Sequence, residues 1–286
     1  MQIWPEEEAR QWRRHYDEAA PYWGKWADQL AEQQDRVNLG LLMAAGVRPG
    51  ARVLDLASGA GEPAMTASRL VGSEGHVTAT DLSAPMMAAM SERVTRYGLA
   101  NVSCRQADME ALPFADASFD AVTCRYGLMY ATDPARSVAE AARMLRGGGG
   151  RVAFMVWGPE ANNNLLFHGL RAANEFLGRP LAEEGFQIPT RFAQPGLVAG
   201  LLSAAGLDDA REQEIQVEPK IKVGVQFWLP LLEMNATEVW KALPPEQQMR
   251  VHQVIAQAYE PFRTGDHYVL RTHIRIISGA RPAVPA

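Results

Sequence analysis

Acidic side chains stand at the ends of three short apolar segments in the first half of the chain, and these segments read as strands. Asp55 ends the first strand, Asp81 ends the second, and Asp108 ends the third. Gly59 and Gly61 follow the first strand and would let a backbone turn approach a ligand closely. Because parallel strands bring their carboxyl ends to one edge of a sheet, we expect these residues to surround one ligand.

The acids discriminate among the ligands that a glycine turn can hold. A dinucleotide pyrophosphate would be repelled by Asp55 and by Glu62, which starts the next helix. Asp81 stands where a carboxylate takes both hydroxyls of a ribose, and Asp108 where one meets the amino edge of an adenine. Together they indicate an adenosine-bearing cofactor with a positive charge. S-adenosylmethionine has a sulfonium, an ammonium and no phosphate, and it meets that description. For Glu62 a role as a helix-dipole partner is equally open.

Five short apolar strands that alternate with helices must position these residues. The strands are expected at 52–56, 76–82, 102–108, 119–127 and 151–157. This alternation is typical of βαβ units with helices on both faces of a parallel sheet. Later strands are expected at 208–221 and 267–279, the last with an alternating pattern that fits an antiparallel edge hairpin. The prediction is an α/β fold with a Rossmann-like, doubly wound, seven-stranded sheet that is mostly parallel, with an antiparallel last strand.

The chain is expected to have four parts. These are an N-terminal helical cap (1–47), a core that binds S-adenosylmethionine (48–157), a helical insertion (158–192), and a C-terminal part of the core (193–286) with an inserted helical segment at about 225–262. The N-terminal helices and the insertions are expected to form a lid over an acceptor pocket. Trp23 or Tyr16 could lie over the cofactor and exclude water from the sulfonium.

Several motifs in residues 16–157 resemble those of class I S-adenosylmethionine-dependent methyltransferases. They are "VLDLASGAGEPAM", "ATDLSAPMM" and the run from "RQADMEALPF" to "GGGGRVAF". Among these enzymes, the chain resembles the ubiquinone/menaquinone biosynthesis methyltransferases and their small-molecule relatives. "YDEAAPYW" near the N-terminus also resembles the entry motif of that family.

The resemblance implies a set of cofactor-binding residues. These are Asp55, Ala57, Ser58, Gly59 and Gly61 for the methionine part, Asp81, Leu82 and Met86 for the ribose and adenine edge, Asp108 and Met109 for the adenine, and Cys124, Arg125 and Tyr126 at the fourth strand. The sequence departs from the family at "YGLMY". The quinone enzymes carry an arginine and an asparagine where this chain has Met129 and Tyr130, which favours a different and more apolar acceptor.

A polar stripe on the helix expected at 162–178 supplies two candidates for a catalytic base. Asn164, His168, Arg171 and Glu175 recur at spacings that put them on one helix face. This face could close over the cofactor and offer His168 or Glu175 as a base, or it could be the solvated side of an ordinary amphipathic helix. Four residues of the later segment could line the acceptor pocket: Trp228, His252, Tyr259 and His267.

The composition of the chain excludes some classes of binding partner and some cellular locations. The net charge of −5 comes without a basic stripe, so no nucleic-acid partner is expected. No apolar run is long enough for a membrane span, and the charged N-terminus does not read as a signal peptide, so a cytoplasmic location is expected. Cys104 and Cys124 are expected to be buried thiols in a reducing compartment. No cysteine or histidine spacing indicates a metal. A homo-oligomer is left open.

The sequence therefore predicts a biosynthetic methyltransferase that uses S-adenosylmethionine and acts on a small or medium hydrophobic metabolite. C-methylation is favoured, with O- or N-methylation open. Two alternatives remain. One is a methyltransferase fold that binds the cofactor and catalyses a non-methylating reaction, and the other is a dinucleotide-dependent oxidoreductase.

Overall fold

The computed structural model describes residues 6–181 and 188–283. Within these ranges, seven strands form one sheet in the order β3-β2-β1-β4-β5-β10-β6. In chain order they are β1 (Arg52–Leu56), β2 (His76–Asp81), β3 (Val102–Gln106), β4 (Ala121–Arg125), β5 (Arg151–Trp157), β6 (Asp208–Val217) and β10 (Thr272–Ala280). The first five pair in parallel, and β10 is antiparallel to both of its neighbours. The predicted Rossmann-like α/β fold is confirmed.

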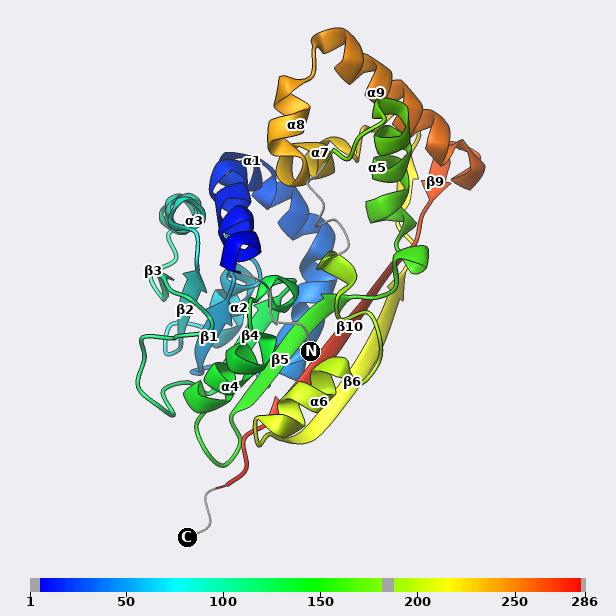
Figure 1. Cartoon of the computed structure of the whole chain (residues 1–286). Helices are drawn as coiled ribbons and strands as arrows, with labels where there is room; N and C mark the ends of the chain where they lie inside the picture. Colours follow the sequence, from blue (N-terminus) through cyan, green and yellow to red (C-terminus); the bar gives the residue numbers. More distant parts are fainter. Residues whose placement is uncertain (1–5, 182–187, 284–286) are drawn as a thin grey trace.

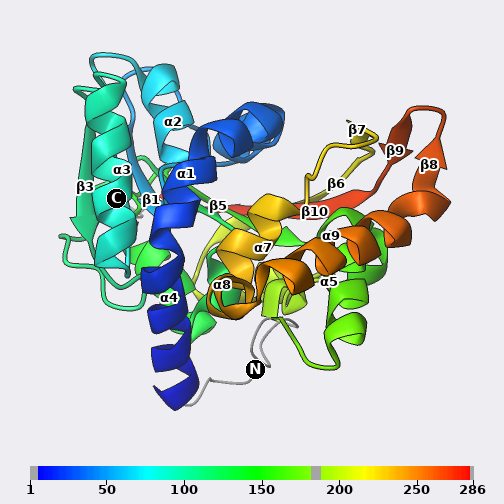
Figure 2. The same cartoon turned by 90° about the horizontal axis from the view of Figure 1, so that it is seen from above.

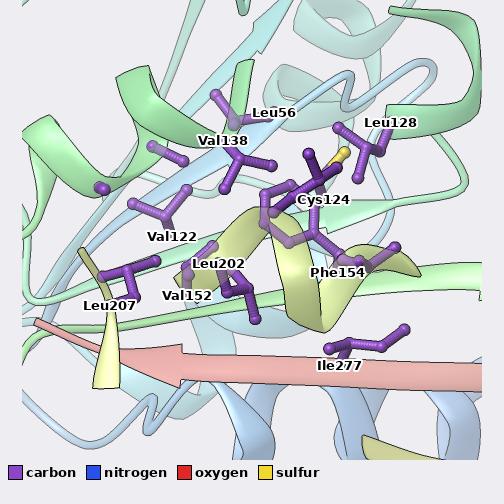
Figure 3. Packing of buried hydrophobic residues seen from close by; sticks show 14 of the residues in the cluster. Leu56, Val122, Cys124, Leu128, Val138, Val152, Phe154, Leu202, Leu207 and Ile277 are labelled. Carbon is purple, nitrogen blue, oxygen red and sulfur yellow. The ribbon is translucent and has the colours of Figure 1, made fainter. Parts of the chain in front are cut away.

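Helices cover both faces of the sheet (Figure 1). One face carries α2 (Ala64–Val71), α3 (Ala84–Arg96) and the C-terminal half of α1 (Glu6–Ala44), and the other carries α4 (Pro134–Met144) and α6 (Leu197–Ala204). Successive strand residues point to opposite faces, so each strand contributes to two apolar cores. In β4, for example, Val122 and Cys124 join the core beneath α4 and α6, which Figure 3 shows, whereas Ala121 joins the other core.

The last strand differs from the expected edge hairpin. β10 lies between β5 and β6, inside the sheet, and almost all of it is buried. Its buried arginine is paired, because Arg275 forms ion pairs with Glu212 and Glu214 of β6. An alternating pattern therefore marked a buried strand with paired charges, not an exposed one.

The expected strand at 267–279 is also divided. Its first part, β9 (His267–Val269), belongs to a separate small sheet with β7 (Lys220–Lys222) and β8 (Arg263–Thr264). The small sheet packs with α5 (Asn164–Leu177), α7 (Leu229–Asn235), α8 (Thr237–Ala242) and α9 (Pro245–Tyr259) around a third apolar core. Figure 1 shows these elements together at one end of the main sheet.

The predicted N-terminal helices are one helix in the described residues, and it changes direction along its length (Figure 2). Its C-terminal half buries Leu41 and Leu42 against the sheet. Nearer the N-terminus, Lys25 and Trp26 both bond Glu233 of α7. α1 therefore links the main sheet to the third core formed by α5, α7, α8, α9 and the small sheet.

The division of the chain into four parts stays a prediction. The first five residues of the expected cap, residues 182–187 of the expected insertion and the last three residues lie outside the described ranges. Within those ranges, the structure has no helix with the length and apolar character needed to cross a membrane.

Candidate functional site

A cavity of about 800 Å³ opens at the carboxyl ends of β1, β2 and β4, between the main sheet, α1, α5 and α7. Most of the predicted cofactor residues line it, namely Trp23, Ala57, Ser58, Gly59, Gly61, Asp81, Leu82, Met86, Asp108, Met109, Arg125 and Tyr126. Asp55 and Cys124 do not line it, because both are fully buried beneath its floor. The fold thus gathers residues from four strand ends around one space.

The glycine turn after β1 has a backbone that few side chains allow. Gly59 and Gly61 have φ values of +52° and +126°, and Ala57 has +51°. A Cβ at Gly61 would lie 2.8 Å from Nη1 of Arg93, so glycine is required there. That Arg93 nitrogen donates to the carbonyl of Ala60 at 2.5 Å, which holds the turn from α3. Backbone groups, rather than side chains, therefore face the ligand space at this turn.

Asp55 supports the turn from below. Its Oδ1 accepts from Oγ1 of Thr123 at 2.6 Å, and its backbone carbonyl accepts from the hydroxyls of Ser58 and Thr80. Oδ2 is buried and has no hydrogen-bond partner among the described residues. Burial raises the pKa of Asp55 to about 7, against the opposing effect of the Thr123 and Ser58 hydroxyls.

Asp81 ties the end of β2 to the glycine turn. Its Oδ2 accepts from the backbone N–H of Gly59 and its Oδ1 from that of Ser83, both at 2.9 Å. Burial raises the pKa of Asp81, and these backbone donors act in the opposite direction. Each carboxylate oxygen keeps a further lone pair. Asp81 can therefore accept two more hydrogen bonds from a ligand in the cavity.

Glu62 and Asp108 place two more carboxylates on the cavity wall. Glu62 is buried, and its Oε2 accepts from Asn38 and Thr66, whereas Oε1 has no partner among the described residues. Asp108 is exposed at the rim, where Oδ1 accepts from the backbone of Glu110 at 2.8 Å. Glu62 thus keeps one buried oxygen without a hydrogen-bond partner in the described residues, and Asp108 is exposed to solvent.

Aromatic rings form a second part of the wall. Tyr130, on the loop after β4, contacts Trp12 and Tyr16 of α1 at ring-centroid distances of 5.5 and 5.2 Å. Burial and the neighbouring Tyr130 hydroxyl raise the pKa of Tyr16 well above its ordinary value. Tyr126 stacks on Trp157 at 4.0 Å with nearly parallel rings. Tyr16 and Trp23, one of which was expected to lie over the cofactor, both line the cavity.

Sequence reasoning missed several lining residues. Tyr130 and Trp157 also follow or end strands, so position at a strand end is the signal that could have found them. The part of the cavity wall that comes from β5, α5 and residues 220–235 is mainly apolar. It is lined by Trp157, Leu165, Leu166, Ile221, Val225, Phe227, Pro230, Leu231 and Met234, with Lys220, Lys222 and Asn235 also contributing.

The four residues expected at the acceptor pocket do not line the cavity. Nε1 of Trp228 donates to Nδ1 of His252 at 2.9 Å, inside the third core. The hydroxyl of Tyr259 is buried between backbone groups of α5, and His267 pairs with Asp266 at the surface. Other residues of the segment 225–262 line the cavity instead.

The two candidates for a catalytic base also lie away from the cavity. Nε2 of His168 is 2.9 Å from the carbonyl of Ala258, and its ring packs against Tyr259 and Phe262 between α5 and α9. Glu175 is exposed near the C-terminal end of α5. Neither side chain lines the cavity. Over residues 6–181 and 188–283, no cluster of three or more histidine, cysteine or acidic residues could hold a metal ion.

The comparisons with known proteins agree with this geometry. Residues 53–149 match the model of a family described as "Methyltransferase domain". A ubiquinone/menaquinone biosynthesis C-methyltransferase of Francisella philomiragia is 41% identical over 105 residues, which are 36% of this chain and 42% of the relative. The match thus spans less than half of the relative's length.

Solved structures share the fold over most of the chain. The YcgJ protein of Bacillus subtilis superimposes with a TM-score of 0.56 and 22% identity, and covers 87% of this chain and 100% of its own. The [4+2]-cyclase SpnF has a TM-score of 0.54 and 18% identity, and covers 87% of this chain and 81% of its own. Residues 53–149 thus match a methyltransferase-domain model, and the chain shares its fold with these structures.

Proposed function

We propose that this chain is a methyltransferase that binds S-adenosylmethionine in the cavity at the carboxyl ends of β1, β2 and β4. The observation that carries the proposal is that Glu62, Asp81 and Asp108 share one wall with the glycine turn. The methyltransferase-domain match of residues 53–149 supports it. Acids around a glycine turn suit a cationic cofactor and disfavour a pyrophosphate, so a dinucleotide oxidoreductase is the weaker reading.

The residues present fit the proposed cofactor. Oε1 of Glu62 is buried without a hydrogen-bond partner in the described residues, and a cationic donor such as an ammonium would stabilise it. The spare lone pairs of Asp81 suit a pair of ribose hydroxyls, and Leu82 and Met109 offer apolar surface for an adenine beside the Asp108 carboxylate. When bound, the cofactor supplies a methyl group that its own sulfonium has already activated.

The chain's part in the reaction is to position the reactants and to exclude water. Tyr16 and Trp23 of α1 lie on the cavity wall, as do the stacked rings of Tyr126 and Trp157. Holding two reactants in register removes much of the entropic barrier to their reaction. We assign no catalytic role to His168 or Glu175.

The acceptor in this proposal is a small or medium hydrophobic metabolite methylated on carbon. Phe227, Leu231 and Met234 give the cavity wall an apolar surface, which supports such an acceptor. The C-methyltransferase name of the Francisella relative supports carbon as the methylated atom. A quinone precursor is disfavoured, because Tyr130 on the wall and the fully buried Met129 stand where the quinone enzymes carry polar residues. A cytoplasmic location belongs to the proposal, supported by the free thiols of Cys104 and Cys124.

Calorimetry and product analysis test the proposal. We expect S-adenosylmethionine and S-adenosylhomocysteine to bind the wild-type chain and Asp81→Asn to weaken both, whereas Asp120→Asn, an acid outside the cavity, is the matched control. Incubation with apolar aromatic and alkene acceptors should then release S-adenosylhomocysteine. Binding of NAD without binding of S-adenosylmethionine would overturn the cofactor. Cofactor binding without product over a broad acceptor panel would favour a non-methylating reaction, because the fold alone does not fix the chemistry.

A further inference from the structure

Two lysines of the small sheet line the cavity without an acidic partner. The chain has four lysines, and two of them are Lys220 and Lys222 of β7. The other two, Lys25 and Lys241, form ion pairs. Within the described ranges, no ion pair joins Lys220 or Lys222 to a carboxylate, and both side chains are exposed on the cavity wall. Two positive charges therefore stand one residue apart at the cavity.

The alternation of β7 places both lysines on the same face of the small sheet. Successive strand residues point to opposite faces, and Ile221 between the lysines packs against the third core. Lys220 and Lys222 consequently project from the face that is turned away from this core. Two acids stand close to β7 along the chain or in the strand pairing, namely Glu218 and Asp266, and neither lines the cavity.

The strand pairing brings a hydroxyl to the same part of the wall. Thr272, the first residue of β10, is paired with Val217 of β6. The N–H of Leu270 donates to the carbonyl of Pro219, the residue before Lys220. Thr272 lines the cavity, and its Oγ1 is buried without a hydrogen-bond partner among the described residues. A hydroxyl in that state can donate to an anion as readily as it can accept.

The other cations on the cavity wall are placed differently. Arg93 pairs with Asp28 at 2.7 Å. Arg125 donates to two amides of α1, and the carboxylate of Glu62 is close enough to act on its charge. Arg13 is exposed on α1, on another element of the wall. β7 is thus the strand that presents two adjacent cations to the cavity.

This arrangement fits a ligand with an apolar body and an anionic end. Val217, Val225 and Phe227 line the cavity close to the lysines in the chain. The acids around the glycine turn would repel an anion, whereas the lysines would attract it. We propose that Lys220 and Lys222 recognise an anionic group, a carboxylate or a phosphate, on the hydrophobic acceptor. This inference rests on the proposed function, because it names the substrate class of the same cavity.

The test is calorimetry of the full chain with four probes that share one apolar body. These are naphthoate, naphthyl phosphate, naphthylmethanol and naphthylmethylamine, each titrated with and without S-adenosylhomocysteine. We expect the two anions to bind about 5- to 20-fold more tightly than the alcohol, and the amine to bind most weakly. Because both lysines are exposed, added salt should reduce the preference for the anions.

Variants assign the preference to β7. Lys220→Gln and Lys222→Gln should each weaken the two anions by about two- to fivefold and leave the alcohol within about twofold of the wild type. Changing both lysines to Glu should reverse the order, so that the amine binds more tightly than naphthoate. Both positions are exposed, so these changes leave the apolar cores intact. Arg13→Gln removes an exposed cation elsewhere on the wall and is the matched control, with all four affinities within about twofold.

The outcomes distinguish this inference from the proposed function. If the wild-type chain binds no S-adenosylhomocysteine, the proposed function fails, whatever the probes do. If it binds S-adenosylhomocysteine but binds the anions no more tightly than the alcohol, the function stands and the anion site is refuted. The site is also refuted if the lysine variants weaken all four probes alike, or if Arg13→Gln removes the preference instead. The anion that loses more affinity in the lysine variants identifies the group as a carboxylate or a phosphate.

Discussion

Gly127→Ala should disturb the junction at which β1 and β4 meet the cavity. A Cβ at this position would lie 2.4 Å from the Cβ of Ala57 and 2.8 Å from Sγ of Cys124. Real Cβ atoms do not approach so closely, and the Cβ of Ala57 cannot rotate away because it is fixed to the backbone. The glycine turn itself must therefore move, and Ala57 already holds a φ of +51° there.

The structure allows the size of the effect to be worked out. Inserting one carbon into a tight site costs typically about 1–3 kcal/mol, and the rigid neighbours here favour the upper half of that range. For a chain of this size the melting temperature should fall by roughly 3–5 °C. Because the displaced turn lines the cavity, affinity for S-adenosylhomocysteine should fall together with stability.

Thermal or urea unfolding and calorimetry measure the two effects. Gly200→Ala is the matched control, because its added Cβ would meet nothing within 4 Å and it stands inside α6. That control should gain about 0.5–1 kcal/mol of stability and keep its affinity. A Gly127→Ala chain that matched the wild type in both stability and affinity would refute the reasoning about this contact.

Three further predictions concern other parts of the fold. The pKa of Asp55 is raised to about 7, so the folded chain binds a proton that the unfolded chain has lost, and this acid's contribution to stability falls as the pH rises from about 4 to 7. Asp55→Asn should therefore gain roughly 2–3 kcal/mol relative to the wild type between pH 5 and pH 8 in urea unfolding; a constant difference would contradict the buried acid. Arg93→Met removes the donor to the carbonyl of Ala60, so it should lower the unfolding free energy by about 1–3 kcal/mol and weaken S-adenosylhomocysteine binding. Unchanged binding would mean that the glycine turn keeps its shape without the Arg93 hydrogen bond. Tyr259→Phe removes the buried hydroxyl that accepts from the N–H of Gly169 and donates to the carbonyl of Leu165, and it should lower the unfolding free energy by about 1–2 kcal/mol. A change in cofactor affinity would contradict the place of Tyr259 outside the cavity.

Local signals were sufficient for most of the main sheet. The apolar run 151–157 matches β5 residue for residue, and the strands carrying Asp55 and Asp81 also lie where their composition put them. The last strand shows the limit of such signals. Alternation in 272–280 indicates a strand, but its place in the sheet depends on pairing with β6, whose Glu212 and Glu214 neutralise Arg275. No local window contains that information.

Some features of the candidate site also follow from local sequence, and others depend on the tertiary structure. By itself, the sequence determined that the glycine turn and its acids meet, because in a parallel sheet all carboxyl ends lie at one edge. It also determined the chemical character of that edge through the residue types there. Only the tertiary structure decided which side chains of the distant helices reach the cavity.

Phe227 and His168 show the physical reason. Phe227 lines the cavity and its neighbour Trp228 faces the third core, and His168 faces α9 instead of the cavity. Which face of a helix or turn is buried depends on the elements packed against it, and these come from distant parts of the chain. Asn38 depends on the fold in the same way, since it hydrogen-bonds both Arg125 and Glu62 only when α1 packs against the ends of β1 and β4.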